Sequence, residues 1–164
     1  MKIVVNDTNI LLDLISIDLF YAFFQLNLEF HTNDLILNEI TDPDQKAIIE
    51  AIVTDNKLIV AETTREDITE IVSLMIRNLS FEDCSIWYYT RKINGILLTG
   101  DARLRRSVEE DNIEVRGILF IFDELVKHGI IEKAEAAIKL DELDQINNRL
   151  PKQEIEKRLN LWRK

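Results

Sequence analysis

Apolar residues along the chain alternate between short continuous runs and longer stretches in which they recur every three or four positions. Short runs are typical of buried strands, and the longer spacing is typical of amphipathic helices. Five strands are predicted, at residues 3–5, 29–32, 57–61, 96–99 and 114–116. Because strands and helices alternate, we expect an α/β fold, a three-layer α/β/α sandwich around a parallel sheet of four to five strands.

Capping residues and breakers set the bounds of the predicted helices. Residues 10–24 predict two short helices that divide near residues 16–18. Asp34 is expected to cap a helix that runs through Ile40 and is ended by Pro43. Further helices are predicted at residues 45–54, from Thr64 to about Arg77, from Ser80 to about Lys92, at 102–110, and at 118–127, the last closed by Gly129.

The C-terminal part of the chain, from Glu132 onward, has helical spacing alone. One predicted helix has Ala134, Ala137, Ile138 and Leu140 on its inner face. Pro151 suits the first turn of a second helix, in which Ile155, Leu159 and Trp162 recur at i, i+4 and i+7. We therefore expect a domain at residues 1–130 and a helical extension at 131–164, packed on that domain or on a dimer partner.

Charge is unevenly distributed along the 164 residues. The formal net charge is −10, and the first 56 residues account for −8 of it. An acidic chain is not an obvious nucleic-acid binder, so such a role would need bound metal or a basic partner. The alternative is that the negative surface keeps the protein soluble.

Some sites and locations are disfavoured by the sequence. The single cysteine, Cys84, cannot form an internal disulfide or, alone, a thiolate metal site. No run has the length of a membrane span or of the apolar core of a signal peptide. The chain is therefore expected in the cytoplasm, with no membrane partner.

Four acids lie where parallel strands end or helices begin. Asp7 and Asp101 each follow an apolar strand, Glu39 lies in a predicted helix, and Asp83 lies near a helix start. Because these ends meet at one edge of the sheet, the four carboxylates could converge on a hard divalent cation. Taken singly, each acid has another reading. Asp7 and Asp101 are then turn residues or N-caps, Asp83 pairs with Ser80 in a capping box, and Glu39 is a solvated helix residue.

The four acidic segments together resemble a known family. Val5–Asn9, Leu37–Ile40, Phe81–Cys84 and Leu98–Asp101 look like the four acidic motifs of PIN-domain ribonucleases, in matching order and spacing. The small bacterial and archaeal members include the VapC toxins. The resemblance covers roughly residues 1–125 and implies a Mg²⁺ or Mn²⁺ cofactor and cleavage of RNA. The C-terminal residues resemble a PIN-like subgroup with an extended tail.

The resemblance also implies a role for individual residues. Asp7, Glu39, Asp83 and Asp101 match the catalytic and metal-site acids. Asn9 and Thr99 match small polar residues that support them. Glu82 adjoins Asp83, but the two should point in different directions on a helix, so Asp83 is preferred. The family further implies a homodimer and, for a toxin, a small antitoxin protein that blocks the acidic site.

Basic and aromatic residues near these acids are candidates for holding RNA. Arg103, Arg105 and Arg106 follow Asp101, and Arg91 and Lys92 end the helix that contains Asp83. A solvated helix face explains the same residues equally well. Trp87, Tyr88 and Tyr89 could stack on bases, but at helical spacing they are more typical of a core. A thiol enzyme based on Cys84 lacks local support.

Two other functions stay open at this point. One is a PIN-fold nucleic-acid-binding or protein-interaction module with little catalysis. The other is a phosphatase or nucleotidase on a doubly wound fold, since acids at strand ends occur there too. Cleavage of RNA, compared with cleavage of small phosphate esters, distinguishes them from the metal-dependent endoribonuclease.

Overall fold

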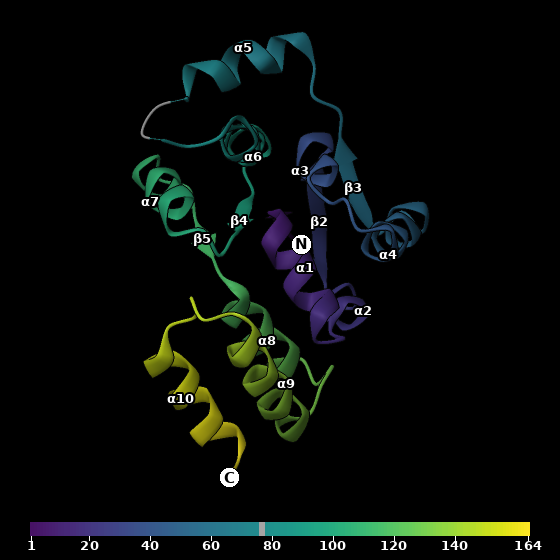
Figure 1. The fold of residues 1–164 in the computed structure, drawn as a ribbon, viewed down its shortest axis with the longest axis vertical. Helices are drawn as coiled ribbons and strands as arrows, with labels where there is room; N and C mark the ends of the chain where they lie inside the picture. The colour runs from purple at the N-terminus through teal and green to yellow at the C-terminus, as the bar shows by residue number, and fades with distance from the viewer. Residues whose placement is uncertain (76–77) are drawn as a thin grey trace.

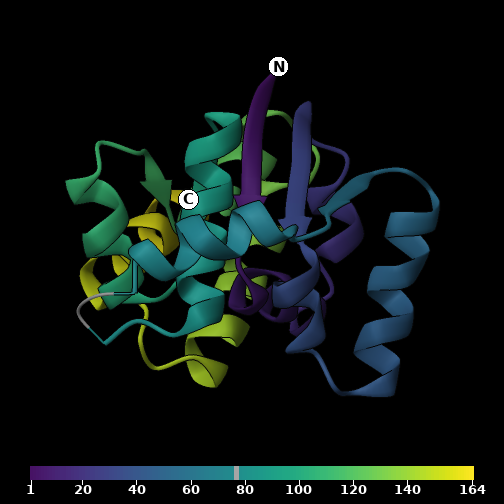
Figure 2. The ribbon, with the colours of Figure 1, turned by 90° about the horizontal axis from the view of Figure 1, so that it is seen from above.

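The computed structural model describes residues 1–75 and 78–164, and within them a five-stranded parallel sheet forms the centre of the molecule (Figures 1 and 2). The strands are β1 (Lys2–Asn6), β2 (Leu28–Asn33), β3 (Leu58–Ala61), β4 (Ile96–Leu98) and β5 (Val115–Arg116). Their order across the sheet is β3-β2-β1-β4-β5. All five predicted strands are thus present, and no end is shifted by more than one residue.

Helices cover both faces of this sheet, which confirms the predicted three-layer sandwich. Neighbouring residues of a strand face opposite sides, so Val4 and Val5 of β1 enter two different cores. The helices are α1 (Thr8–Ser16), α2 (Phe20–Phe23), α3 (Asp34–Asn38), α4 (Pro43–Thr54), α5 (Arg65–Ser73), α6 (Phe81–Ile93), α7 (Ala102–Glu110), α8 (Ile118–Lys127), α9 (Lys133–Ile146) and α10 (Lys152–Trp162). Side chains from α3, α5, α6 and α7 fill the Val5 core, and the other helices fill the Val4 core.

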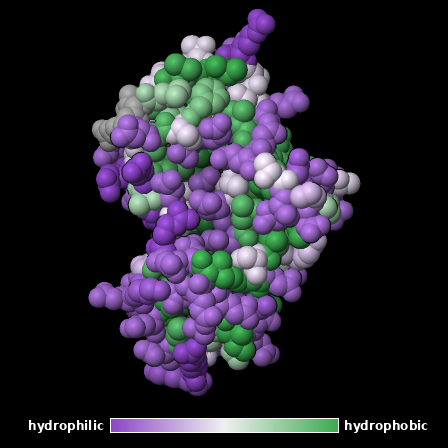
Figure 3. Space-filling model, in the orientation of Figure 1, coloured by the Kyte–Doolittle hydropathy of each residue, from purple (hydrophilic) through white to green (hydrophobic). Residues whose placement is uncertain are grey.

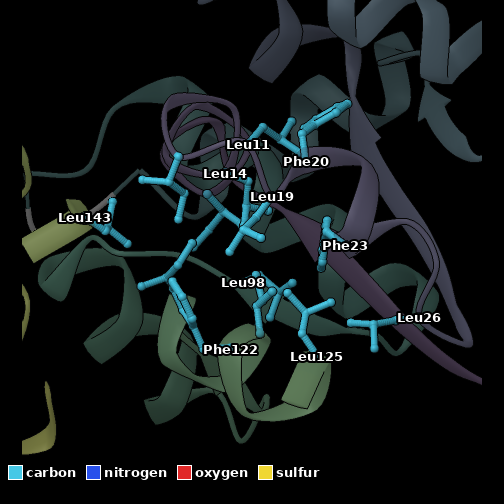
Figure 4. Packing of buried hydrophobic residues seen from close by; sticks show 14 of the residues in the cluster. Leu11, Leu14, Leu19, Phe20, Phe23, Leu26, Leu98, Phe122, Leu125 and Leu143 are labelled. Atoms are coloured by element: carbon cyan, nitrogen blue, oxygen red, sulfur yellow. The ribbon is translucent and has the colours of Figure 1, made fainter. Parts of the chain in front are cut away.

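The Val4 core extends from the sheet to the C-terminus of the chain. Leu98 of β4 packs with Leu11, Phe23, Phe122 and Leu143, which come from four different helices (Figure 4). The buried face of α10 contains Ile155, Leu159 and Trp162, as its spacing predicts. The C-terminal helices therefore pack against the same core as α1 and α8.

Polar contacts also fix α10 to the rest of the chain. The Arg158 guanidinium donates two hydrogen bonds to the Asp123 carboxylate of α8, at 2.8 and 2.7 Å. The Trp162 ring stacks on Phe122 at 6.2 Å between centroids. Together these contacts hold α10 on α8.

Some predicted helix ends were wrong. Pro43 does not end α3, which stops at Asn38; it occupies the first turn of α4, where its missing N–H needs no partner. The N-cap of α3 is Asn33, whose side chain accepts a hydrogen bond from Ile36 N–H. The end predicted near Arg77 lies outside the described residues.

The inner face of α9 was also placed incorrectly in part. Ala134 and Ile138 are exposed, whereas Ala136 and Leu143 are buried. The helix is therefore rotated from the predicted face, because it packs against two helices, α8 and α10, and not against the sheet alone.

The surface seen in Figure 3 is mostly hydrophilic, with hydrophobic atoms gathered at the top over α5. Ile68, Val72 and Met75 are exposed there. Among the described residues, no helix has the length and apolar character needed to cross a membrane.

Candidate functional site

The sheet places Asp7 and Asp101 at its switch point. From β1 the chain continues to β2 and β3 on one side of the sheet, and β4 and β5 lie on the other side of β1. The strand order therefore reverses between β1 and β4. Ligands of open α/β folds bind beyond the carboxyl ends of the strands at such a point. Asn6 pairs with Leu98, so Asp7 and Thr99 are the first residues beyond both strands.

A single hydroxyl joins the two acids. Thr99 Oγ1 donates a hydrogen bond of 2.7 Å to Asp7 Oδ2 and accepts one of 3.1 Å from Asp101 N–H. The Asp7 and Thr99 side chains are buried, Thr99 completely. The Asp101 carboxylate caps α7 by accepting from the Arg103 and Leu104 amides. The N-cap reading of Asp101 is thus correct, and the residue also lies beside Asp7.

Glu39 reaches the same place through Thr8. Thr8 N–H donates to Asp7 Oδ1 at 2.8 Å, and Thr8 Oγ1 donates to Glu39 Oε1 at 2.9 Å. Thr8 was not singled out from the sequence. A threonine directly after the strand-end acid, in the first turn of a helix, was the available signal.

Asp83 and Glu82 enter the cluster from the start of α6. Asp83 forms the predicted capping box with Ser80, each accepting a hydrogen bond from the other's backbone N–H. Its charge nevertheless acts on Asp7 and Glu39. The charge of Glu82 also acts on Glu39 and Asp83.

Burial and mutual repulsion both favour protonation of these acids. The pKa of Asp7 is raised mainly by burial, opposed by the hydrogen bonds from Thr99 and Thr8, with smaller contributions from Asp83 and Asp101. Burial likewise raises the pKa of Glu39 and of Asp83, and neighbouring carboxylates add to each shift. The charged neighbours that cause these shifts are all acids. The site therefore has an excess of negative charge that a cation would relieve.

The cluster has carboxylate oxygens that could bind such a cation, but the described side chains are not arranged as a set of metal ligands. Asp101 Oδ2, Asp83 Oδ1 and Glu39 Oε2 accept no hydrogen bond from any described residue. Within residues 1–75 and 78–164, no three His, Cys, Asp or Glu side chains already form a group that could hold a metal ion. The donor chemistry of the carboxylate oxygens fits a hard divalent cation.

Two asparagines flank Asp7, and neither bonds to it. Asn9 lies half-buried in the first turn of α1, and its side chain makes no hydrogen bond with the described residues. Asn6 is fully buried; its Nδ2 donates to the His31 carbonyl, whereas its Oδ1 has no donor among the described residues. In this structure Thr8 and Thr99, and not Asn9, hold the Asp7 carboxylate.

The basic candidates divide into two groups. Arg91 pairs with Asp111 at 3.2 Å, and Lys92 pairs with Asp67 at 3.0 Å, so both have acidic partners elsewhere. Arg103 and Arg106 are exposed on α7, and Arg105 is half-buried there. The α7 arginines, which follow Asp101, are the nearer candidates for a phosphate contact.

The aromatic candidates and the cysteine have structural roles. Trp87 is buried and donates to Asp111, Tyr88 donates to Asp67, and Tyr89 lies 2.7 Å from His31 Nδ1. Burial raises the pKa of the Cys84 thiol to about 11, which disfavours the thiolate that a nucleophile requires. The core readings of these residues agree with the structure.

Asp7 and Asp101 lie beyond the strand ends at the switch point of the parallel sheet. A family model described as "DUF3368: PIN domain" matches residues 3–164. The chain therefore belongs to this PIN-domain family, and the match includes the C-terminal helices.

Two individual proteins resemble the chain over part of its length. Endoribonuclease Nob1 of Methanocaldococcus jannaschii is 33% identical over 95 residues, which are 56% of this chain and 47% of Nob1. The chain thus matches about half the length of that relative. The chain also resembles one chain of the crystal structure of VapBC2 from Rickettsia felis bound to a promoter DNA fragment. The two chains superpose with a TM-score of 0.54 and are 15% identical. That match covers 71% of this chain and 98% of the other, and it shows a shared fold.

Proposed function

We propose that the protein is a Mg²⁺- or Mn²⁺-dependent endoribonuclease that hydrolyses RNA phosphodiester bonds at the acidic cluster. The observation that supports the proposal is the hydrogen-bonded arrangement at the β1–β4 switch point, in which Thr99 connects Asp7 to Asp101 and Thr8 connects Asp7 to Glu39. The charge of Asp83 acts on Asp7 and Glu39 as well. The similarity to endoribonuclease Nob1 supports RNA as the substrate class.

The side chains of the cluster have distinct roles in this proposal. Thr99 holds Asp7 and the Asp101 backbone together, and Thr8 connects Asp7 to Glu39, so two hydroxyls fix the positions of three acids. Asp101 and Asp83 are presented by the first turns of α7 and α6. Each of Glu39, Asp83 and Asp101 keeps one oxygen for a ligand or for an attacking water.

The donor set fits a divalent cation. When bound, the cation supplies an activated water and stabilises the phosphate oxygens. The residues around it orient the carboxylates. Burial of the site makes uncompensated carboxylate charge unfavourable, so the cation would stabilise the charged form of these acids. Arg103, Arg105 and Arg106, on the helix that Asp101 caps, would contact RNA phosphates beyond the reach of the cation.

RNA cleavage by matched variants tests the proposal. A fluorescent single-stranded RNA is incubated with Mn²⁺ and either wild type, Asp101→Asn or Asp42→Asn. Asp42 caps α4 as Asp101 caps α7, and asparagine is an equally good N-cap, so both variants should fold. We expect cleavage by wild type and Asp42→Asn but not by Asp101→Asn.

The other outcomes of this assay point to other functions. Equal cleavage by all three proteins would indicate a contaminating nuclease. Binding of RNA without cleavage would favour the nucleic-acid-binding module. Hydrolysis of small phosphate esters but not RNA would favour the phosphatase.

Within this function, we also propose the toxin half of a toxin–antitoxin pair as the biological role, acting as a homodimer. The fold shared with a VapBC2 chain favours this role. An acidic site is complementary to a basic residue of an antitoxin. We expect a short neighbouring reading frame whose product co-purifies with the chain and suppresses its RNA cleavage. If expression of the chain alone left cell growth unaffected, the toxin role would be contradicted.

A further inference from the structure

A cavity of about 340 Å³ lies beside the acidic cluster, between the sheet edge and the C-terminal helices. Its lining includes Thr99 and Gly100, which adjoin the cluster, and Arg149 and Leu150, which come from the segment that joins α9 to α10. This segment runs back toward β5 and the start of α8 (Figure 1). The volume is in the lower part of the roughly 300–1,000 Å³ range of ligand pockets.

The segment that closes the cavity is fixed by side-chain hydrogen bonds. Asn147 Nδ2 donates to Asp13 Oδ2 of α1 at 3.1 Å, and Asn147 Oδ1 accepts from Arg149 N–H at 3.0 Å. One amide thus attaches the α9–α10 segment to α1 and orders the backbone of Arg149. The cavity is therefore a built feature of the fold, to which the C-terminal helices contribute one wall.

Two arginines line this cavity. Burial raises the pKa of Asp13 in the same cavity, and the positive charge of one arginine, Arg149, acts to lower it. Within the described residues, neither Arg105 nor Arg149 makes a side-chain hydrogen bond or ion pair. Arg105 packs closely against Gly117: a Cβ there would lie 3.2 Å from Arg105 Nη2. Two such donors in one cavity match a phosphodiester, which an arginine can bind bidentately.

The remaining lining is suited to a nucleobase. Ile10, Ile118 and Leu150 provide apolar surface, and Asp13 provides a carboxylate. Asp13 Oδ1 accepts no hydrogen bond from the described residues, since Asn147 bonds to Oδ2. A carboxylate oxygen can accept from the exocyclic amino group of cytosine, whereas uracil offers it only the ring N3–H, which lies between two carbonyl oxygens that repel the carboxylate.

We infer that this cavity holds the nucleotide next to the scissile phosphate of single-stranded RNA, with its phosphate on Arg105 and Arg149 and an amino-bearing base against Asp13. The inference rests on the proposed ribonuclease function and adds a binding subsite to it. The C-terminal helices then contribute to substrate selection. Cytosine, the pyrimidine with an amino group, is preferred over uracil at this position.

Binding measured without catalysis tests the inference. Fluorescein-labelled oligo(C) and oligo(U) are titrated with the protein in EDTA and followed by fluorescence anisotropy. We expect Arg149→Gln to weaken oligo(C) binding about tenfold, since a hydrogen bond to a charged group is lost. Arg163→Gln, an exposed arginine outside the cavity, is the matched control and should bind as wild type does.

Base preference is tested by a second variant. Asp13→Asn should remove the preference of the wild type for oligo(C) over oligo(U), and thermal melting of each variant confirms that it folds. Equal binding by wild type, Arg149→Gln and Arg163→Gln would overturn the inference. So would a wild type that binds oligo(U) as tightly as oligo(C).

Cleavage with Mn²⁺ separates this inference from the ribonuclease proposal. If Arg149→Gln weakens binding and no protein cleaves RNA, the subsite is correct and the ribonuclease proposal is wrong. If RNA is cleaved and Arg149→Gln has the wild-type KM, the ribonuclease proposal is correct and the subsite is wrong. The expected result is cleavage with a KM raised about tenfold and a nearly unchanged kcat.

Discussion

Replacing Thr99 by valine removes the hydroxyl that joins Asp7 to Asp101 while keeping the shape of the side chain. The lost bond to the buried Asp7 carboxylate is of the charge-assisted kind, which contributes about 1.5–3 kcal/mol. The Asp101 N–H also loses its acceptor, although Asp101 is partly solvated. We therefore expect Thr99→Val to lower the free energy of unfolding at pH 7 by about 2–4 kcal/mol. The melting temperature should fall by roughly 10 °C.

Thr90→Val is the matched control for this measurement. Thr90 is also fully buried, but its hydroxyl donates to Ile86 O within the same helix, at 2.6 Å, so no charge is involved. Its loss should cost about 1 kcal/mol. Urea unfolding of both variants and wild type at pH 7 gives the comparison. A Thr99→Val variant no less stable than Thr90→Val would refute the reasoning.

The pH dependence of the same comparison tests the charge of Asp7. The pKa of Asp7 is raised in the folded protein, so its contribution to stability is greatest below the unfolded pKa and is lost as the pH rises through the folded pKa. The Thr99 hydroxyl opposes this loss by stabilising the charged form. The stability gap between wild type and Thr99→Val should therefore narrow as the pH is lowered and Asp7 becomes protonated. A constant gap would contradict a charged Asp7.

Three further predictions concern the rest of the fold. Hydrogen bonds from the Thr64 backbone and neighbouring side chains lower the pKa of Asp67 to about 2. Asp67→Asn should therefore lower the free energy of unfolding by about 1–2 kcal/mol near pH 7, and this difference from wild type should disappear as the pH falls from about 4 to 2. Urea unfolding at pH 7 and pH 2 measures the difference, and the same value at both would refute the prediction. Trp162→Ala should cost about 3–5 kcal/mol by the same assay, and a smaller loss than 1 kcal/mol would mean that α10 is not fixed on α8. Cys84 should resist alkylation by iodoacetamide at pH 8 in the native protein and react after unfolding in urea, because its pKa is about 11.

The sheet could be predicted because its strands have simple apolar patterns. Parallel strands covered on both faces are typically continuous apolar runs, and β3, β4 and residues 3–5 of β1 follow this pattern, whereas β2 and β5 contain charged residues. The position of Asp101 beside Asp7 follows from this alternation and from the rule for switch points. Local signals were weaker guides to helix ends. Pro43 suits both the end of one helix and the first turn of the next, and only tertiary packing shows which applies.

The side-chain partners could not be predicted from spacing. Thr8 reaches Glu39 across 31 positions of sequence, and Arg91 reaches Asp111 across 20. Such pairs depend on how α1 and α3, or α6 and α7, approach each other. Arg149 is a further example: its place in the lining of the cavity depends on the packing of α9 and α10 against the Val4 core. The face of α9 was mispredicted for the same reason.

The melting temperature of metal-free protein, with and without added Mn²⁺ or Mg²⁺, tests the central claim that the four acids form a cation site. A cation at about 100 times its Kd should stabilise the wild type by about 2.7 kcal/mol, or roughly 5–10 °C. Asp7→Asn should show no such shift, and at pH 7 without metal it should be at least as stable as wild type, since it removes a buried charge. Equal shifts in the two proteins, or none in the wild type, would contradict the claim.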